Sequence, residues 1–155
     1  MKVVIISDAH GDISLIRKIA NIEHNADAFI DAGDSCLEAS EIRPFISVRG
    51  NCDFSFYPLS RVLYFDCWSV FLTHGASVSM SSLINLTKSH KCNVLIYGHT
   101  HKCEYKIVDS IYVINPGSIS RPRDGYVGTY LVVDFNSDDI KITKKEVFLW
   151  IYRTN

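Results

Sequence analysis

Short apolar runs with little polar alternation recur along the chain. They are Val3–Ile6, Ala28–Ile30, Phe45–Val48, Val70–Leu72, Val94–Tyr97 and Tyr112–Ile114. A strand with one solvated face alternates apolar and polar positions, whereas a strand covered on both faces reads as a continuous apolar run. The pattern therefore predicts several buried strands.

Two segments have the periodicity of amphipathic helices. In Gly11–Asn25 the polar residues fall on one helical stripe and the isoleucines on the opposite one, and Asp12 is the expected N-cap. Ser79–Lys91 divides in the same way, and Ser35–Arg43 is expected to add a short helix.

Later segments read as antiparallel hairpins. Tyr126–Asp134 and Ile140–Phe148 flank a polar turn, and Arg61–Phe65 and Ser69–Leu72 form a second such pair. Strand–helix alternation followed by hairpins predicts one α/β domain over residues 1–155, with a mixed sheet or two sheets. An exposed Trp150 or Tyr152 near the end would indicate a homo-oligomer.

Composition narrows the class of partner. The chain has 155 residues, 47% of them hydrophobic, with 16 Lys+Arg against 17 Asp+Glu. This balance argues against stable nucleic-acid binding and against a membrane partner, but a local charge cluster for a small phosphorylated ligand can lie within a neutral total.

Cysteine usage favours a cytoplasmic protein. The five cysteines are an odd number without the spacing of a disulfide framework, and the first residues lack the long apolar stretch of a signal peptide. Four of them are expected to be small buried hydrophobes: Cys36, Cys67, Cys92 and Cys103.

Polar side chains follow the apolar runs. They include Asp8, His10, Asp34, Asn51, His74, His99 and His101, so that four of the six histidines belong to this set. Ligands of open α/β sheets bind at the carboxyl ends of the strands, where these side chains would converge. Any single member is better explained as a turn residue or helix cap, but the ordered set favours a site.

These residue types point to transition metals. Imidazole and carboxylate ligands together suit Mn, Fe, Zn, Ni or Co rather than Ca or Mg. Seven ligands exceed the needs of one tetrahedral ion, whereas two ions that share a bridging carboxylate would use them all. Two dications outweigh the charge of two carboxylates, so the site would attract an anionic substrate and activate a water molecule.

The order of the motifs resembles the calcineurin-like metallophosphoesterase superfamily, and within it the small bacterial and archaeal phosphodiesterases. The motifs are Asp8-x-His10, Gly33-Asp34, Gly50-Asn51-Cys52-Asp53, Thr73-His74-Gly75, Gly98-His99-Thr100-His101 and Asn115-Pro116-Gly117-Ser118. The resemblance implies a four-layer α-β-β-α sandwich of two mixed sheets flanked by helices. It also implies hydrolysis of small phosphodiesters by in-line attack of a hydroxide between two divalent ions, for which we expect Mn²⁺.

The resemblance also divides the ligands. Asp8, His10 and His101 would hold the first ion, Asn51, His74 and His99 the second, and Asp34 would bridge the two. On this basis Asp34, Asn51 and His74 are the residues expected to carry catalysis.

The chain departs from many members at Cys52, where a histidine is thought to protonate the leaving group. Cations nearby would favour a cysteine thiolate, which is a poor acid, so diesters with activated aryl leaving groups should be cleaved best. Asp53 would either orient a ligand or form a turn, and Arg121 and Arg123 would either bind phosphate or lie solvated in a loop.

Two rival functions remain at this stage. One is a phosphomonoesterase or nucleotidase, and the other is a non-catalytic protein-binding scaffold of the same fold. The complete ligand set favours an enzyme, because scaffolding alone gives no reason to keep four histidines and two aspartates.

Overall fold

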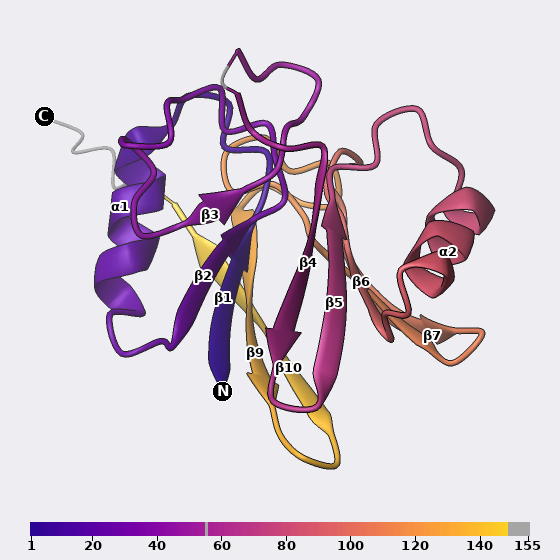
Figure 1. Cartoon of the computed structure of the whole chain (residues 1–155). Helices are drawn as coiled ribbons and strands as arrows, with labels where there is room; N and C mark the ends of the chain where they lie inside the picture. Colours follow the sequence, from indigo (N-terminus) through magenta and orange to yellow (C-terminus); the bar gives the residue numbers. More distant parts are fainter. Residues whose placement is uncertain (55, 149–155) are drawn as a thin grey trace, which may run out of the picture.

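The computed structural model describes residues 1–54 and 56–148, and Figure 1 shows the arrangement of its elements. One five-stranded sheet has the order β10 (Ile140–Val147), β9 (Gly128–Phe135), β1 (Lys2–Ile6), β2 (Ala28–Asp31) and β3 (Ile46–Ser47). The other has the order β4 (Ser60–Phe65), β5 (Trp68–Thr73), β6 (Val94–Ile96), β8 (Ile111–Pro116) and β7 (Cys103–Val108). The helices are α1 (Ile13–Ile22) and α2 (Met80–Ser89).

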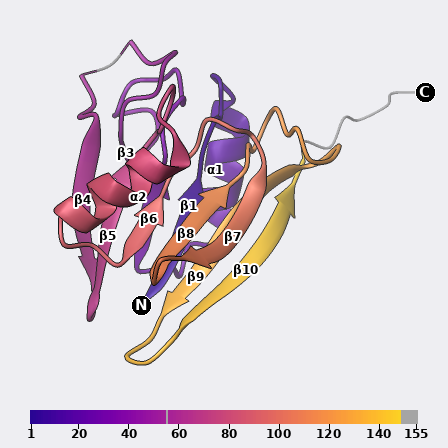
Figure 2. The same ribbon diagram turned by 90° about the vertical axis from the view of Figure 1, so that its right-hand side faces the viewer.

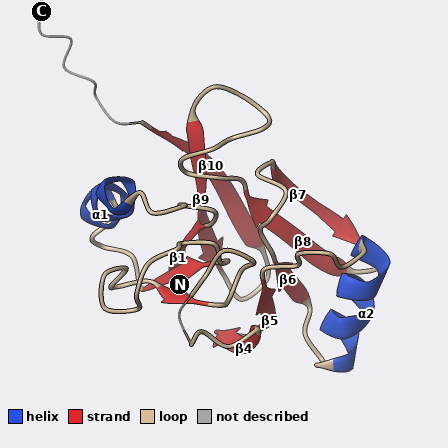
Figure 3. Ribbon diagram, turned by 90° about the horizontal axis from the view of Figure 1, so that it is seen from above, coloured by secondary structure: helices blue, strands red, loops and turns tan. Residues whose placement is uncertain are grey.

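The two sheets pack face to face and each carries a helix on its outer side. Alternate residues of β1 face inward, and Val3 and Ile5 belong to the core between the sheets, together with Ile96 of β6. Side chains of α1 cover the other face of β1, and side chains of α2 cover the other face of β6. Viewed from above, the helices lie on opposite sides of the sheets (Figure 3). The predicted four-layer sandwich of two mixed sheets is confirmed.

The strands that precede the polar motifs are parallel within each sheet. β1 pairs with β2 and β2 with β3, while β5 pairs with β6 and β6 with β8, all in parallel register. Because parallel strands bring their carboxyl ends to one edge, the loops that follow them gather at the upper end of the molecule in Figure 1.

The two long helices form as predicted, but the short one does not. The Asp12 side chain caps α1 by accepting a hydrogen bond from the Leu15 N–H. The predicted helix over Ser35–Arg43 is wrong, because these residues form bends and turns. Cys36 has a left-handed backbone with φ of 55°, and the Glu38 N–H donates to the Glu41 carboxylate instead of to a helical carbonyl.

Strand β7 was not predicted from the sequence. It lies at the edge of its sheet beside β8 (Figure 2), and its Tyr105 and Ile107 side chains are exposed. Trp150 and Tyr152, on which the expectation of a homo-oligomer depended, lie outside the described residues. Within the described residues, no helix is long and apolar enough to cross a membrane.

Candidate metal centre

The ligand loops share an unusual backbone conformation. Positive φ angles occur two residues apart at Asp8 (54°) and His10 (46°), and again at His99 (71°) and His101 (58°). Asp34 has a φ of 58° as well. Such conformations cost energy for residues with a side chain, although aspartate and histidine adopt them more readily than most, and they cluster at functional sites. Because the positive φ angles recur at an interval of two residues, the two side chains of each loop can face the same space.

Two hydrogen bonds orient the Asp8 carboxylate. Its Oδ2 accepts from Ser7 Oγ at 2.6 Å and from the His99 N–H at 3.0 Å. Its Oδ1 is fully buried and has no hydrogen-bond partner, although His101 Nε2 lies 3.1 Å away and His10 Nε2 lies 3.8 Å away. A buried carboxylate oxygen without a donor is costly unless a cation neutralises it.

Two imidazoles are fixed by main-chain carbonyls. His101 Nδ1 lies 2.8 Å from the Arg121 carbonyl, and His74 Nδ1 lies 2.8 Å from the Ala32 carbonyl. A carbonyl can only accept, so both Nδ1 atoms carry hydrogen and both Nε2 atoms turn toward the site. Metal-binding histidines are commonly oriented in this way.

The Nε2 atoms face other acceptors. His101 Nε2 lies 3.2 Å from His10 Nε2, while His74 Nε2 lies 3.3 Å from Asp34 Oδ2 and 3.1 Å from Asn51 Oδ1. Asn51 Oδ1 is in turn 3.2 Å from His99 Nδ1. Atoms with lone pairs can lie this close only if protons or metal cations lie between them.

The ligand atoms form two groups. Asp8, His10 and His101 offer atoms within 4.8 Å of one another, and so do Asp8, Asp34 and His74. Asp8 is common to both groups. The donor set and the orphaned Asp8 Oδ1 therefore fit a pair of adjacent divalent cations.

Protonation within the site follows burial and charge. Burial lowers the pKa of His10, which keeps its imidazole neutral. Burial also lowers the pKa of His74, but the hydrogen bond with Asp34 and the charge of Asp8 outweigh this and raise it above its ordinary value. Burial raises the pKa of Asp34, and the hydrogen bonds from His74 and the Cys52 N–H bring it below its usual range. At a pH below the raised pKa of His74, a cation would therefore compete with a proton for this imidazole.

Asp53 holds two ligand loops together. Its carboxylate accepts from the N–H groups of Asp34 at 2.9 Å, Gly50 at 2.7 Å and Cys36 at 2.8 Å. The Cys52 N–H completes the junction by donating to Asp34 Oδ1 at 2.8 Å. These contacts favour the orienting role of Asp53 over that of a simple turn residue.

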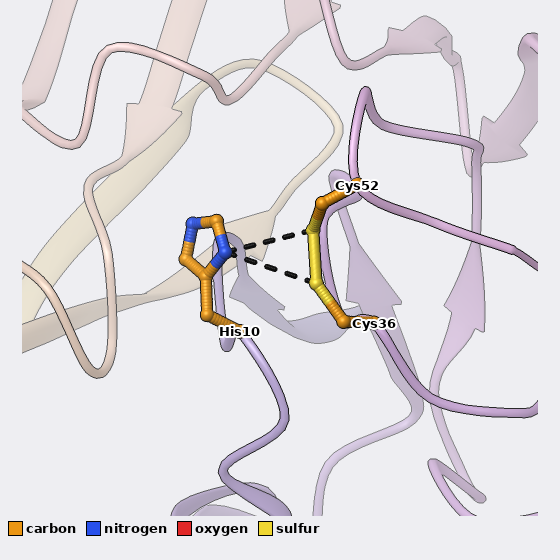
Figure 4. A group of neighbouring side chains, drawn as sticks. All are labelled: His10, Cys36 and Cys52. Atoms are coloured by element: carbon orange, nitrogen blue, oxygen red, sulfur yellow. Dashed lines mark hydrogen bonds between the residues drawn. A yellow bond between two sulfur atoms is a disulfide. The ribbon is translucent and has the colours of Figure 1, made fainter.

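The largest difference from the sequence analysis is a disulfide between Cys36 and Cys52 (Figure 4). The expectation that Cys36 is a free, buried hydrophobe is wrong, and Cys52 is not a thiolate in this form. Cys92 is buried as expected, whereas Cys67 is exposed and Cys103 half-buried. The disulfide also removes one of the two arguments for a cytoplasmic location, which stays a prediction.

All seven predicted ligands are brought together, and the two arginines border them. Five of the ligands line a surface cavity of about 310 Å³ with Arg121 and Arg123. Ser7 is a residue that sequence reasoning missed. Its hydroxyl orients Asp8, and apart from its adjacency no signal in the sequence marks it.

Comparison with known proteins identifies relatives of this chain. Residues 1–138 match the model of the calcineurin-like phosphoesterase superfamily domain. The probable metallophosphoesterase YsnB of Bacillus subtilis is 31% identical over 146 residues, which cover 89% of this chain and 86% of that protein. Phosphodiesterase YfcE of Escherichia coli is 33% identical over 98 residues, which cover 57% of this chain and 52% of that protein. A predicted phosphoesterase from Streptococcus pneumoniae has a similar crystal structure, with a TM-score of 0.85, 25% identity and coverage of 94% of this chain and 88% of that one.

Proposed function

Because this chain belongs to the calcineurin-like phosphoesterase superfamily, we propose that it is a phosphodiesterase that hydrolyses small phosphodiesters with two divalent ions, Mn²⁺ first among them. The observation that carries the proposal is the cluster of acceptor atoms around the orphaned Asp8 Oδ1. Acceptor atoms packed this closely destabilise the fold unless protons or cations lie between them.

Each residue has an assigned part. Asp8, His10 and His101 would hold one ion, Asn51, His74 and His99 would hold the other, and Asp34 would bridge them. When bound, the ions supply a Lewis acid for the phosphoryl oxygens and lower the pKa of the water that serves as nucleophile. Arg121 and Arg123, at the rim of the cavity, bind the phosphate oxygens of the substrate.

While the disulfide is intact, the leaving group receives no proton from Cys52. Its sulfur is bonded to Cys36 and carries no hydrogen. Diesters whose leaving group is already a good one, such as an aryl oxide, should therefore react fastest. Equal rates for aryl and alkyl diesters would contradict this part of the proposal.

The surroundings of the site favour a diester over a monoester. One groove of about 560 Å³ adjoins the site at His99 and is walled by Met80, Leu83 and Tyr97. A second groove of about 390 Å³ adjoins it at Asn51 and His74. A phosphodiester has two organic groups to place, and these grooves offer room for both.

The experiment strips the protein with a chelator, restores saturating Mn²⁺, and compares an aryl phosphodiester with the matched monoester. We expect turnover only with the metal and a preference for the diester. Asp34→Asn and His74→Ala should each lower kcat/KM by about 10²–10³-fold, the scale of losing one charge-stabilising group.

Matched controls lie outside the site. Asp138→Asn and His24→Ala change exposed residues of the same types and should keep wild-type turnover. A preference for the monoester would favour the phosphomonoesterase alternative. Tight Mn²⁺ binding without hydrolysis of any phosphate ester would favour the scaffold.

A further inference from the structure

The Cys36–Cys52 disulfide joins the two loops that carry Asp34 and Asn51. Cys36 lies two residues after Asp34, and Cys52 directly follows Asn51. The two cysteines are 16 residues apart in sequence, and their Cα atoms lie 5.8 Å apart. The covalent link therefore spans the place where the β2 and β3 loops meet.

The disulfide also touches a ligand directly. His10 Nδ1 lies 3.5 Å from Cys52 Sγ and 3.8 Å from Cys36 Sγ, on the side of the ring opposite the Nε2 that faces Asp8 (Figure 4). The sulfur pair thus contacts the third of the loops that build the centre. A change in its covalent state would reach ligands of both proposed ions.

The pair is open to small thiols. Both cysteines are half-buried, and Cys36 lines a surface cavity of about 230 Å³ with Leu37 and Phe54. The noncovalent ties through Asp53 would remain when the disulfide opens, because they involve the carboxylate and main-chain N–H groups. Reduction of the disulfide would therefore loosen the contact between the β2 and β3 loops, and the hydrogen bonds of Asp53 would still hold the loops together.

We propose that Cys36 and Cys52 form a reversible redox modification site, and that its disulfide tightens the binding of divalent ions by the neighbouring loops. The inference rests on the proposed function for the identity of those ligands. A dithiol is the chemical class of reductant that fits, and a low-molecular-weight disulfide is the corresponding oxidant.

Reduction takes place by two successive thiol–disulfide exchanges. A thiolate of the dithiol attacks Cys36 Sγ, a mixed disulfide forms, and the bond to Cys52 Sγ breaks with its electron pair on Cys52, which takes up a proton. The second thiol of the reagent then displaces Cys36, so that the dithiol is oxidised to a cyclic disulfide and the protein holds two thiols.

The experiment compares the metal-free protein in two states, after treatment with oxidised glutathione and after treatment with dithiothreitol followed by its anaerobic removal. Thiols counted in denaturant should number at most three in the first state and five in the second, because Cys67, Cys92 and Cys103 lie outside the pair and an exposed thiol such as Cys67 can itself take up glutathione. Mn²⁺ titrated by calorimetry should bind about tenfold more weakly to the reduced protein, the scale seen when a group that orients a metal ligand is lost. Reoxidation should restore the affinity.

Variants separate the pair from the other cysteines. Cys36→Ser combined with Cys52→Ser should have the affinity of the reduced protein under both treatments. Cys67→Ser combined with Cys103→Ser changes as many cysteines and should keep the full response. If the first variant fails to fold, the two states of the wild-type protein still decide the question.

Each contrary result has a distinct meaning. Five thiols after oxidation, or equal Mn²⁺ affinity in the two states, would overturn this inference and leave the proposed function intact. If neither state bound Mn²⁺, the proposed metal centre and this inference would fail together. None of these measurements uses a substrate, so the identity of the hydrolysed ester does not affect them.

Discussion

At the scale of one residue, Gly50 has no room for a side chain because Asp34 lies directly against it. A Cβ atom at this position would lie 2.0 Å from Asp34 Oδ1 and 2.5 Å from the Asp34 nitrogen. Gly50→Ala should therefore displace the Asp34 carboxylate, weaken Mn²⁺ binding by about tenfold and destabilise the fold by about 1–3 kcal/mol.

Gly125→Ala is the matched control for this substitution. Its added Cβ would meet no atom within 4 Å, and the change should alter stability by less than about 0.5 kcal/mol. Calorimetric titration and thermal denaturation test both variants. Wild-type Mn²⁺ affinity in Gly50→Ala would show that the loop adapts and that Asp34 is not held by this contact.

Asp31 is a buried carboxyl that the proposed chemistry does not use. It accepts hydrogen bonds from Ser47 Oγ at 2.6 Å and from the Gly33 N–H at 3.3 Å, and burial raises its pKa to about 7. The folded protein therefore binds this proton more tightly than the unfolded chain, where the pKa is about 3.9. Stability from this group is fully present below pH 4 and is lost as the pH rises through about 7.

Asp31→Asn should remove this dependence. The asparagine oxygen can still accept from the Gly33 N–H, and its NH2 group can donate to Ser47 Oγ, whose hydroxyl then donates to the Val48 carbonyl. Because the amide carries no charge, the free energy of unfolding of the variant should rise relative to that of the wild type by about 2 kcal/mol or more between pH 5 and pH 8. Urea denaturation of the metal-free proteins at both pH values measures the difference. Parallel curves for the two proteins would mean that Asp31 is ionised at no cost.

At the scale of elements, the sequence predicts a strand correctly where a continuous apolar run is also buried in the core. The runs at Val3–Ile6 and Val94–Tyr97 form the buried strands β1 and β6, and the ligand motifs follow β1, β2, β3, β5 and β6. The ligand set could therefore be predicted from the ends of the apolar runs. β7 was missed because Cys103–Val108 contains no continuous apolar run. Its residues alternate instead, with Cys103, Tyr105 and Ile107 apolar and Glu104 and Lys106 charged, which is the pattern of an edge strand with one polar face.

The conformations of the loops were the part of the fold least predictable from the sequence. The helix expected over Ser35–Arg43 does not form: the distant Asp53 accepts from the Cys36 N–H, and the side chains of Ser35 and Glu41 accept from the N–H groups of Leu37 and Glu38. A separation of 16 residues likewise says nothing about cysteine pairing until the β2 and β3 loops are seen to meet. Both features depend on tertiary contacts rather than on local preference.

The junction of these two loops supports a prediction at the same scale. Asp53→Asn replaces one of two accepting oxygens by an NH2 group, which would face either the Cys36 N–H or the N–H groups of Asp34 and Gly50. Unpaired buried donors cost about 1–3 kcal/mol, and the loss of ligand orientation should weaken Mn²⁺ binding by about 10–100-fold.

The control is Asp138→Asn, which changes an exposed aspartate in the β9–β10 turn and should affect neither property. If Asp53→Asn lowered stability but left Mn²⁺ affinity unchanged, Asp53 would be a turn residue only. Measuring both properties on each variant therefore separates the two roles.

At the scale of the whole molecule, the proposed centre joins the two sheets. Asp8, Asp34 and Asn51 follow strands of one sheet, whereas His74 and His99 follow strands of the other. Metal ions held by both sets would fasten the sheets along one edge of their shared core. Metal binding should thus stabilise the entire fold and not only the loops.

The stability of the fold should therefore depend on the metal and on the pH. Mn²⁺ at about 100 times its Kd should stabilise the protein by about 2.7 kcal/mol, or raise the Tm by roughly 5–10 °C, at pH 8. The gain should shrink as the pH falls, because the raised pKa of His74 lets a proton compete with the ion for Nε2. Thermal denaturation with Mn²⁺ and with chelator, at pH 8 and pH 5.5, tests both statements.

Hydrogen exchange shows whether both sheets share this stabilisation. Amides of β1 and β2 and amides of β5 and β6 should all gain protection when Mn²⁺ binds, because opening either sheet would release an ion that ligands of the other sheet help to hold. In His74→Ala the added protection of β5 should diminish most, and His24→Ala should behave as the wild type. Protection confined to β1 and β2 would mean that one sheet alone binds the ions, and the two-sheet centre would have to be abandoned.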